Sequence, residues 1–430
     1  MKRLANRCLT GILKPVFLIW FICLGLMPMK IGAQPEMETG SQKPMPNEWI
    51  DKDTHHKVIR LSRIEGSSMS FYFHNDPFVD GKMVFYNSSK QKGGEESERL
   101  RRPATNDNVY DKQLYLLNLK TFQAERLTNS PTPMSGEVVS TKLKEVFFQV
   151  KDSVFAVNVV TKKQRLIFVF PEDYKGSIAT VNADGTLLAG SKASDEQKEI
   201  TRQHPLKSEF FQLIFDAHLP NDLFTVNIKT GELKKIHTEN TWLGHVQFSP
   251  IDPLLLMFCH EGPWHKLDRI WTINVISKEV KLMHKRTMEN EIAGHEWLGT
   301  DGKTIWYDLQ MPKGQTFFIG GTEIATGKEQ KWEMQRDEWS IHFNTWHNGE
   351  LFCGDGADPG QVAKAKNAQW IYLFTPDGQN LKSEKLVNMK NHDYKLEPNV
   401  HFTPDGKWIV FRANFEGIEE VYAVEVKRQE

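Results

Sequence analysis

The feature that most constrains the fold of this chain is a strand-forming sequence motif that recurs along almost its whole length. Each copy contains alternating apolar residues, a turn of the Thr-Gly or Thr-Lys kind, and a second alternating run. Seven copies begin at Leu114, Val154, Leu223, Ile270, Phe317, Ile371 and Val421. Hairpin turns of the Asp-Gly type interleave with them, as at Asp184 and Asp405. Self-similarity at about 40–50 residues with several short strands per unit is typical of β-propellers.

We therefore predict an all-β fold, a seven-bladed β-propeller over residues 51–430. A chain of 430 residues is long for one ordinary core, but each propeller blade has its own small core and stacks on its neighbours. The early strand from Lys57 to Ser62 is expected to complete the last blade and close the ring. The longest interval between copies contains a charged stretch, 195–208, which predicts an insertion with helical character on one face.

The N-terminal segment 1–33 is typical of a secretory signal. Basic residues precede an apolar run over 16–27, which is shorter than the roughly 20 residues of a membrane span, and Ala33 offers a small residue for cleavage. We expect an exported, periplasmic protein whose mature chain does not insert into a membrane; an uncleaved anchor is the alternative. Residues 34–50, which are polar and rich in Pro, Gly, Ser and Glu, are expected to form a flexible leader.

Charge and cysteine content exclude several kinds of partner and crosslink. The formal net charge is -1, so the chain has no global field that would attract nucleic acid. Two cysteines of the mature chain, Cys259 and Cys353, lie in similar phrases and are expected to be buried, unpaired thiols. The oligomeric state is left open.

Histidines gather where strands begin, at His245, His295, His342 and His401. Equivalent positions in successive blades face one central channel, so these imidazoles are expected to converge there. The alternative is a structural role, in which each histidine bonds within its own blade. The loop over 258–271 is also dense in ionisable groups, which predicts a binding loop or, alternatively, a solvated surface loop.

The segment from Glu397 to His401 is expected to be extended. Strand alternation would place Glu397, Asn399 and His401 on one face. A carboxylate, an amide and an imidazole together predict a metal site for Mn²⁺, with Ca²⁺ as the other possibility.

At several phrases the chain resembles the oligogalacturonate lyases, a family of pectin-degrading β-propeller enzymes. The matching segments include Trp242-Leu-Gly-His, Phe258-Cys-His-Glu-Gly-Pro, Gly294-His-Glu-Trp, Gly354-Asp-Gly and Phe402-Thr-Pro-Asp, in the order of the family. The resemblance implies metal-assisted β-elimination on an oligogalacturonide or another uronate oligosaccharide. It also implies that His245 is the base and that His295 is a metal ligand.

The chain departs from the family at the other metal ligands, where Tyr394, Glu397 and Asn399 replace a glutamine and two histidines. We expect Glu397, Asn399 and His401 to serve instead. An arginine that grips the substrate in the family is also missing, and His218 lies in that region. The residues expected to contact substrate are His74, His218, His260, Glu261, His265, Arg269, His342 and Arg412.

Two other functions remain open from the sequence. A non-catalytic propeller of the bacterial envelope would bind a glycan or a protein, and the altered ligand positions favour this alternative. A hydrolase on the same scaffold would need a paired acid and base, and no carboxylate pair identifies itself.

Overall fold

The structure is a computed structural model that describes residues 34–89 and 112–428. By its internal contacts the chain divides into Met1–Gln34 and Pro35–Glu430, and every element described below belongs to the second unit. The predicted secretory signal over 1–33 lies outside the described residues. Among the described residues, no helix has the length and apolar character needed to cross a membrane.

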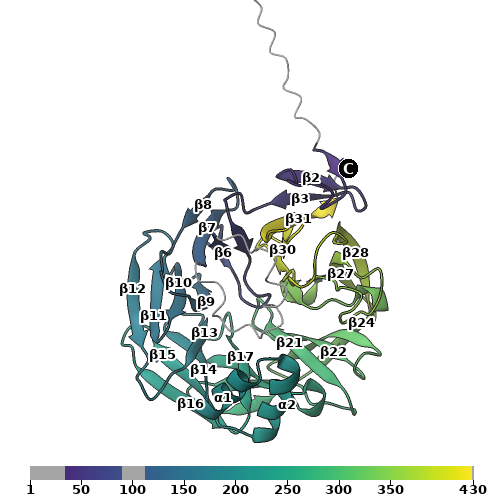
Figure 1. The fold of residues 1–430 in the computed structure, drawn as a ribbon. Helices are drawn as coiled ribbons and strands as arrows, with labels where there is room; N and C mark the ends of the chain where they lie inside the picture. Colours follow the sequence, from purple (N-terminus) through teal and green to yellow (C-terminus); the bar gives the residue numbers. More distant parts are fainter. Residues whose placement is uncertain (1–33, 90–111, 429–430) are drawn as a thin grey trace, which may run out of the picture. The chain divides into compact units, whose positions relative to one another are not determined.

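The second unit is built almost entirely from antiparallel sheets that follow one another around a ring (Figure 1). The first sheet contains β4 (Ser67–Met69), β5 (Phe78–Val79), β6 (Lys82–Ser88), β7 (Gln113–Asn118) and β8 (Ala124–Arg126). The second contains β9 (Ser135–Ser140), β10 (Glu145–Val150), β11 (Ser153–Asn158) and β12 (Gln164–Val169). The third contains β13 (Ser177–Val181), β14 (Leu187–Ala193), β15 (Asn221–Asn227) and β16 (Leu233–Glu239). The fourth contains β17 (Trp242–Phe248), β18 (Leu255–Glu261), β19 (Ile270–Asn274) and β20 (Val280–Leu282).

The next sheet has eight strands and consists of two four-stranded antiparallel meanders. The first meander is β21 (Ile292–Leu298), β22 (Thr304–Gln310), β23 (Phe317–Glu323) and β24 (Glu329–Met334). The second is β25 (Phe343–Trp346), β26 (Leu351–Gly354), β27 (Trp370–Asp377) and β28 (Asn380–Asn388). One parallel pair, Glu333 with Asn380, joins them. The all-β propeller architecture is confirmed, and the predicted number of seven blades, which counts these two meanders separately, stays a prediction.

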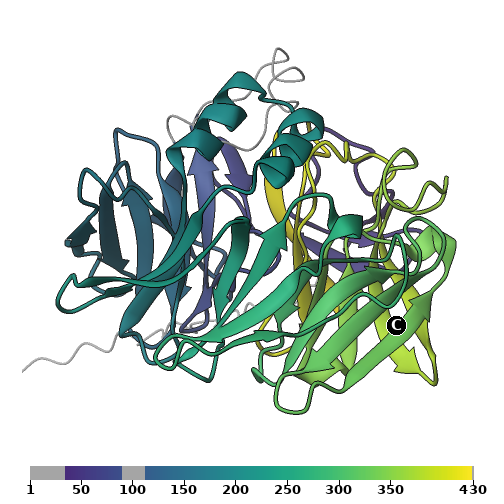
Figure 2. The same cartoon turned by 90° about the horizontal axis from the view of Figure 1, so that it is seen from below.

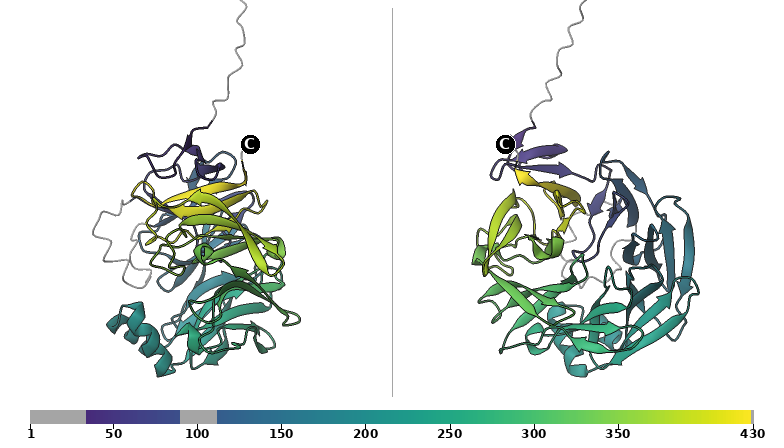
Figure 3. Two further views of the ribbon diagram at one scale, coloured as in Figure 1. Left: turned by 90° about the vertical axis from the view of Figure 1, so that its right-hand side faces the viewer. Right: turned by 180° about the vertical axis from the view of Figure 1, so that it is seen from behind.

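The last sheet closes the ring with strands from both ends of the described chain. It contains β29 (His401–Phe402), β30 (Trp408–Ala413), β31 (Glu420–Arg428), β3 (His56–Arg60), β2 (Glu48–Asp51) and β1 (Glu36–Met37). Early β3 pairs antiparallel with late β31, with Val58 opposite Val424. The views in Figure 3 show the purple and yellow strands side by side. The predicted closure by the early strand is therefore confirmed.

The expected flexible leader is wrong, because this segment packs onto the closing sheet. Trp49 on β2 is fully buried, and its indole N–H donates to the hydroxyl of Thr39 at 2.8 Å. Its ring meets that of Tyr422 edge-on at 5.8 Å between centroids. Residues 35–51 therefore belong to the folded body.

A recurring asparagine explains why the strand phrases end where they do. Asn118, Asn158, Asn227 and Asn274 end their strands, and each side-chain oxygen accepts hydrogen bonds from the backbone amides two and three residues later. Such a side chain mimics a backbone turn and reverses the chain into the next strand. These repeats thus share a turn-forming asparagine as well as an alternating apolar pattern.

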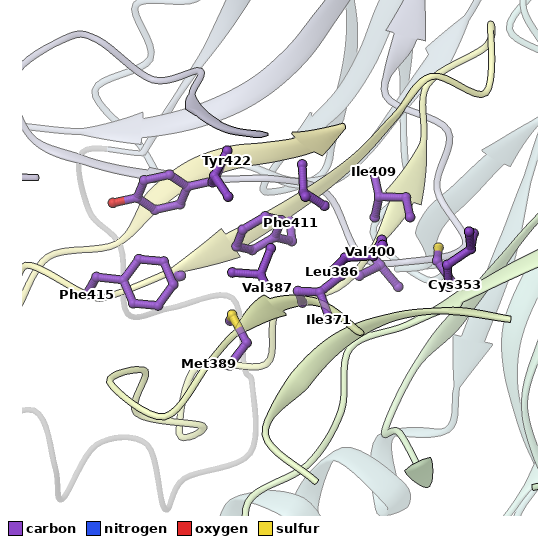
Figure 4. Close-up of a cluster of buried hydrophobic side chains, with 14 of the residues drawn as sticks. Cys353, Ile371, Leu386, Val387, Met389, Val400, Ile409, Phe411, Phe415 and Tyr422 are labelled. Atoms are coloured by element: carbon purple, nitrogen blue, oxygen red, sulfur yellow. The ribbon is translucent and has the colours of Figure 1, made fainter. Parts of the chain in front are cut away.

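Apolar clusters fill the spaces between neighbouring sheets. One cluster joins β27 and β28 to β30 and β31 through Ile371, Val387, Phe411 and Tyr422 (Figure 4). Cys353 is buried in this cluster and Cys259 is also buried, and both are free thiols, as expected. Each sheet is therefore held by its two neighbours, as in other repeat proteins.

The predicted insertion lies between β14 and β15 and forms two helices, α1 (Asp195–Gln203) and α2 (Lys207–Ala217). Ser194 caps α1 by accepting a hydrogen bond from the backbone amide of Gln197. Figure 2 shows both helices projecting beyond the strands on one side of the ring. The insertion thus extends beyond the strand ends on this side of the ring.

Candidate active site

Two histidines are turned out of the regular strand alternation by matching β-bulges. β17 and β21 each shift register against the next strand just after a Gly-His pair. His245 and His295 have left-handed φ values of 47° and 44°. Glycine is required before the second histidine, since a Cβ on Gly294 would lie 2.5 Å from the ring of Trp264. The Gly-His phrase therefore serves to aim an imidazole.

Two buried carboxylates flank the imidazole of His245. Its Nδ1 lies 3.1 Å from Oε1 of Glu296, and its Nε2 lies 3.4 Å from Oε1 of Glu261. The guanidinium of Arg269 spans both, at 2.9 Å from Glu261 and 3.2 Å from Glu296. Burial opposes ionisation of these carboxyls, but Arg269 and His245 outweigh it and hold the pKa of each below its usual value. His245 therefore sits in an anionic setting that suits a proton acceptor.

Two other histidines share a second arrangement. His295 Nδ1 lies 3.0 Å from Asp308, and His342 Nδ1 lies 2.9 Å from Asp355. Their rings are 4.9 Å apart between centroids. A carboxylate on Nδ1 fixes the tautomer and leaves Nε2 with a free lone pair, which is how metal-binding histidines are usually held.

Glu397 completes this donor group of His295, His342 and Glu397. Its Oε2 lies 3.7 Å from the Nε2 of His342, which is buried and has no hydrogen-bond partner among the residues that the structure describes. Burial opposes ionisation of Glu397, but His342, Arg412 and then His295 outweigh it and lower its pKa. Two imidazole nitrogens and a carboxylate are donor types that divalent ions such as Mn²⁺ accept, but their ligand atoms do not all lie within 4.8 Å of one another.

Among the described residues, the one trio whose ligand atoms all lie within 4.8 Å of one another is a different one, His245, Cys259 and Glu296. Burial raises the pKa of the Cys259 thiol well above its usual value, so the thiolate that binds metal is disfavoured. Arg269 already supplies a positive charge to Glu296. This trio is therefore better suited to holding a base than to holding a cation.

A cleft of about 410 Å³ opens beside His295. Trp264 and Phe211 supply aromatic walls, and Lys207, Lys313 and His265 supply cationic or hydrogen-bonding groups. Lys207 lies at the start of α2, with its ammonium 5.8 Å from the ring of Trp264. Aromatic rings with cations between them suit a sugar that carries carboxylates.

Residues 72–74, which lie outside the strands, also contact the histidines. The ring of Tyr72 lies 5.2 Å from that of His342 and 6.3 Å from that of His245. His74 lies 5.6 Å from His245, and burial lowers its pKa to about 3, with a further contribution from His245. A separate cavity of about 370 Å³ is lined by His74 and His401 and shares no lining residue with the cleft.

The family profile described as oligogalacturonate lyase matches residues 63–429. The chain belongs to the oligogalacturonate lyase family. It is 27% identical over 333 residues to an oligogalacturonide lyase of Pectobacterium atrosepticum, and the match covers 73% of this chain and 82% of the relative. It is 28% identical over 335 residues to an oligogalacturonate lyase of Dickeya dadantii, with the same coverage. The predicted enzyme class, a lyase, is thereby confirmed.

A solved structure of an oligogalacturonate lyase in complex with manganese is similar in fold. Its TM-score is 0.72 at 24% identity, and the match covers 89% of this chain and 96% of that one. This likeness supports the propeller architecture of the family member described here.

The metal ligands that were predicted from the sequence do not all lie together in the structure. His295 and Glu397 belong to the donor group. The expectation that Glu397, Asn399 and His401 share one strand face is wrong, because Asn399 has a φ of 52° and β29 begins only at His401. The side chain of Asn399 accepts from a backbone amide at 3.0 Å, and His401 Nε2 lies 3.2 Å from the carbonyl of Tyr72.

The predicted substrate contacts do not lie together in the structure. His265 lines the cleft, while His74 and His342 lie beside the histidine cluster. Glu261, Arg269 and Arg412 are bonded inside the protein; Arg412 donates to the carbonyl of Glu397 at 2.7 Å. His260 stacks on Trp271, and His218 ends α2.

Sequence reasoning missed several residues that shape the site. Glu296 directly follows His295, and Asp355 lies in the Gly354-Asp-Gly phrase, so both were within recognised motifs. Asp308 and Tyr72 carry no such signal. They reach the site through strand pairing and chain crossing that only the fold reveals.

Proposed function

We propose that this lyase cleaves oligogalacturonides, or closely related uronate oligomers, by metal-assisted β-elimination. The proposal rests on one observation: an imidazole backed by two carboxylates lies beside a separate group of metal-type donors. Glu296 joins the two, since it contacts His245 while its neighbour His295 belongs to the donor group.

His295, His342 and Glu397 would hold the cation. Mn²⁺ is our choice, because nitrogen and oxygen donors suit it and a solved relative is described in complex with manganese. Bound there, the cation would offset the charge of a uronate carboxylate and so make the neighbouring C5 proton more acidic.

His245 then acts as the general base. Its imidazole takes the C5 proton, the C5–H electron pair forms the C4–C5 double bond, and the C4–O bond breaks to release the rest of the oligomer. Glu261 and Glu296 stabilise the imidazolium that this step creates. Tyr72 and His74 cover one side of the imidazole and limit the access of water.

The cleft supports a uronate rather than a neutral sugar as substrate. Lys207 and Lys313 lie on its rim, where they can pair with carboxylates of successive sugar units. Trp264 offers an aromatic face between them and His295.

The test follows the ultraviolet absorbance of the unsaturated product with digalacturonate or trigalacturonate, Mn²⁺, and a chelator control. We expect product formation that the chelator stops, and a loss of about 10²–10⁴-fold in kcat for His245→Ala with folding and metal content retained. No product from any uronate oligomer would contradict the proposal and favour a glycan-binding propeller.

We also propose that the protein is exported to the periplasm after removal of residues 1–33. The basic start and short apolar run support this proposal. N-terminal sequencing of the protein from its native host would test it, and an intact Met1 in the cytoplasmic fraction would contradict it.

A further inference from the structure

Arg269 is the largest charged side chain among the fully buried residues described, and it does not line the cleft. It lies just before β19, and its guanidinium carbon sits 4.3 Å from the centroid of the Trp264 ring. A buried cation is costly unless it is paired. Packing alone therefore does not explain why this charged side chain is buried here.

The pairing of Arg269 is divided between two elements. Its Nη1 donates to Oε2 of Glu261 at the end of β18, and its Nη2 donates to both oxygens of Glu296 on β21 at 3.2 Å. Both carboxylates are at least nine-tenths buried. Without a cation between them, the two carboxylates would repel each other, and their positions would change.

The same two carboxylates hold His245 on their other side. Oε1 of Glu296 faces Nδ1, and Oε1 of Glu261 faces Nε2. The two carboxylates and one guanidinium sum to a single negative charge, which a proton on His245 brings to zero. Arg269 thus reaches the base only through Glu261 and Glu296.

We propose that Arg269 is a positioning residue for His245, acting through Glu261 and Glu296 to fix the imidazole. This inference rests on the proposed role of His245 as the base. The guanidinium fork matters as well as the charge, because one flat group must meet two carboxylates from different strands.

The test compares Arg269→Lys, which keeps the charge and loses the fork, with Glu296→Gln, which keeps the volume and loses the charge. Arg165→Lys is the control, since Arg165 forms a similar two-point pair with Glu145 at the surface, outside the cleft lining. Three quantities are measured: kcat and KM on trigalacturonate at saturating Mn²⁺, the imidazole nitrogen resonances of His245 in the metal-free protein, and the unfolding temperature. His245→Ala identifies the resonances.

We expect kcat to fall about 10²-fold in both variants with KM changed far less, and the His245 nitrogen resonances to move. Arg165→Lys should match the wild type in all three. Should Arg269→Lys fail to fold, Arg269→Gln takes its place, because Glu296→Gln touches His245 directly and cannot decide the role of Arg269. Variants that lose only thermal stability, with wild-type kcat and unmoved His245 resonances, would overturn the proposal.

The resonances also separate the two proposals. If the wild-type protein makes no unsaturated product, the proposed function fails, while movement of the His245 signals in the variants still upholds the role of Arg269. Unmoved signals in an active enzyme remove that role alone.

Discussion

At the scale of single residues, the site depends on backbone conformations that strands rarely offer. His245 and His295 adopt left-handed φ values, which cost about 1–2 kcal/mol at a residue with a Cβ. The flanking carboxylates and the close packing after each glycine hold them there. The sequence could predict that both histidines face the channel, since the Gly-His phrase repeats, but not the bulge that aims them.

The metal ligands proposed here could be predicted from the sequence only in part. His295 and Glu397 were found by motif and resemblance, whereas His342 was expected to contact substrate. The alternation argument for Asn399 and His401 failed because it assumed an extended chain, and one left-handed residue breaks that pattern. Which nitrogen of a histidine is free depends on its hydrogen-bond partner, and the partners Asp308 and Asp355 come from other strands.

Because His342 and His401 lie in different places, one variant can serve as the control for the other. His342→Ala removes a donor and should weaken Mn²⁺ binding by at least about 100-fold. His401→Ala should leave the affinity near that of the wild type, because His401 lines the other cavity. Equilibrium dialysis with metal analysis measures both. Equal weakening in the two variants would show that His401 is also a ligand.

At the scale of elements, the helical insertion adds a wall to the cleft. Its presence was predictable because the repeat interval was long, but the predicted range, 195–208, ended short of α2, which runs to Ala217. The apolar face of α2, with Phe210 and Ile214 buried, lies within a stretch that has little charge. The prediction from charged residues therefore included α1 but not most of α2.

Lys207 at the start of α2 should contribute to substrate binding more than to chemistry. Lys207→Ala is expected to raise KM roughly fivefold with kcat nearly unchanged, because a partly exposed ion pair contributes up to about 1 kcal/mol. Lys198→Ala on α1, where Lys198 pairs with Asp195, is the matched control. Steady-state kinetics on trigalacturonate at low and high salt would check this, and an unaltered KM would remove Lys207 from the binding site.

At the scale of the whole molecule, repeat periodicity predicted the architecture well because each sheet repeats one apolar pattern and one turn chemistry. The closing strand was likewise foreseeable, since the last blade lacked a partner strand. The segment before it was misjudged because its composition is typical of a linker. What orders it is tertiary: Trp49 and Met45 are buried in the cluster that joins the last sheet to β27 and β28.

Trp49→Ala should therefore destabilise the whole ring. We expect a loss of about 3–5 kcal/mol in the free energy of unfolding, as for other large aromatic residues truncated in a core. Lys52→Ala, directly after this segment, exposed and paired with Glu38, should change it by less than about 0.5 kcal/mol. Urea unfolding followed by tryptophan fluorescence compares them. A small change for Trp49→Ala would restore the leader interpretation.

The pairing of β3 with β31 also bears on the order in which the molecule can be assembled. β3 is synthesised early and β31 late, so the edge of β3 that pairs with β31 stays unpaired while the other sheets are being made. Until β31 arrives, the intermediate is an open arc with two unpaired edges, which other polypeptides can join. A chaperone that shields β3 would protect one of these two edges until β31 pairs with it.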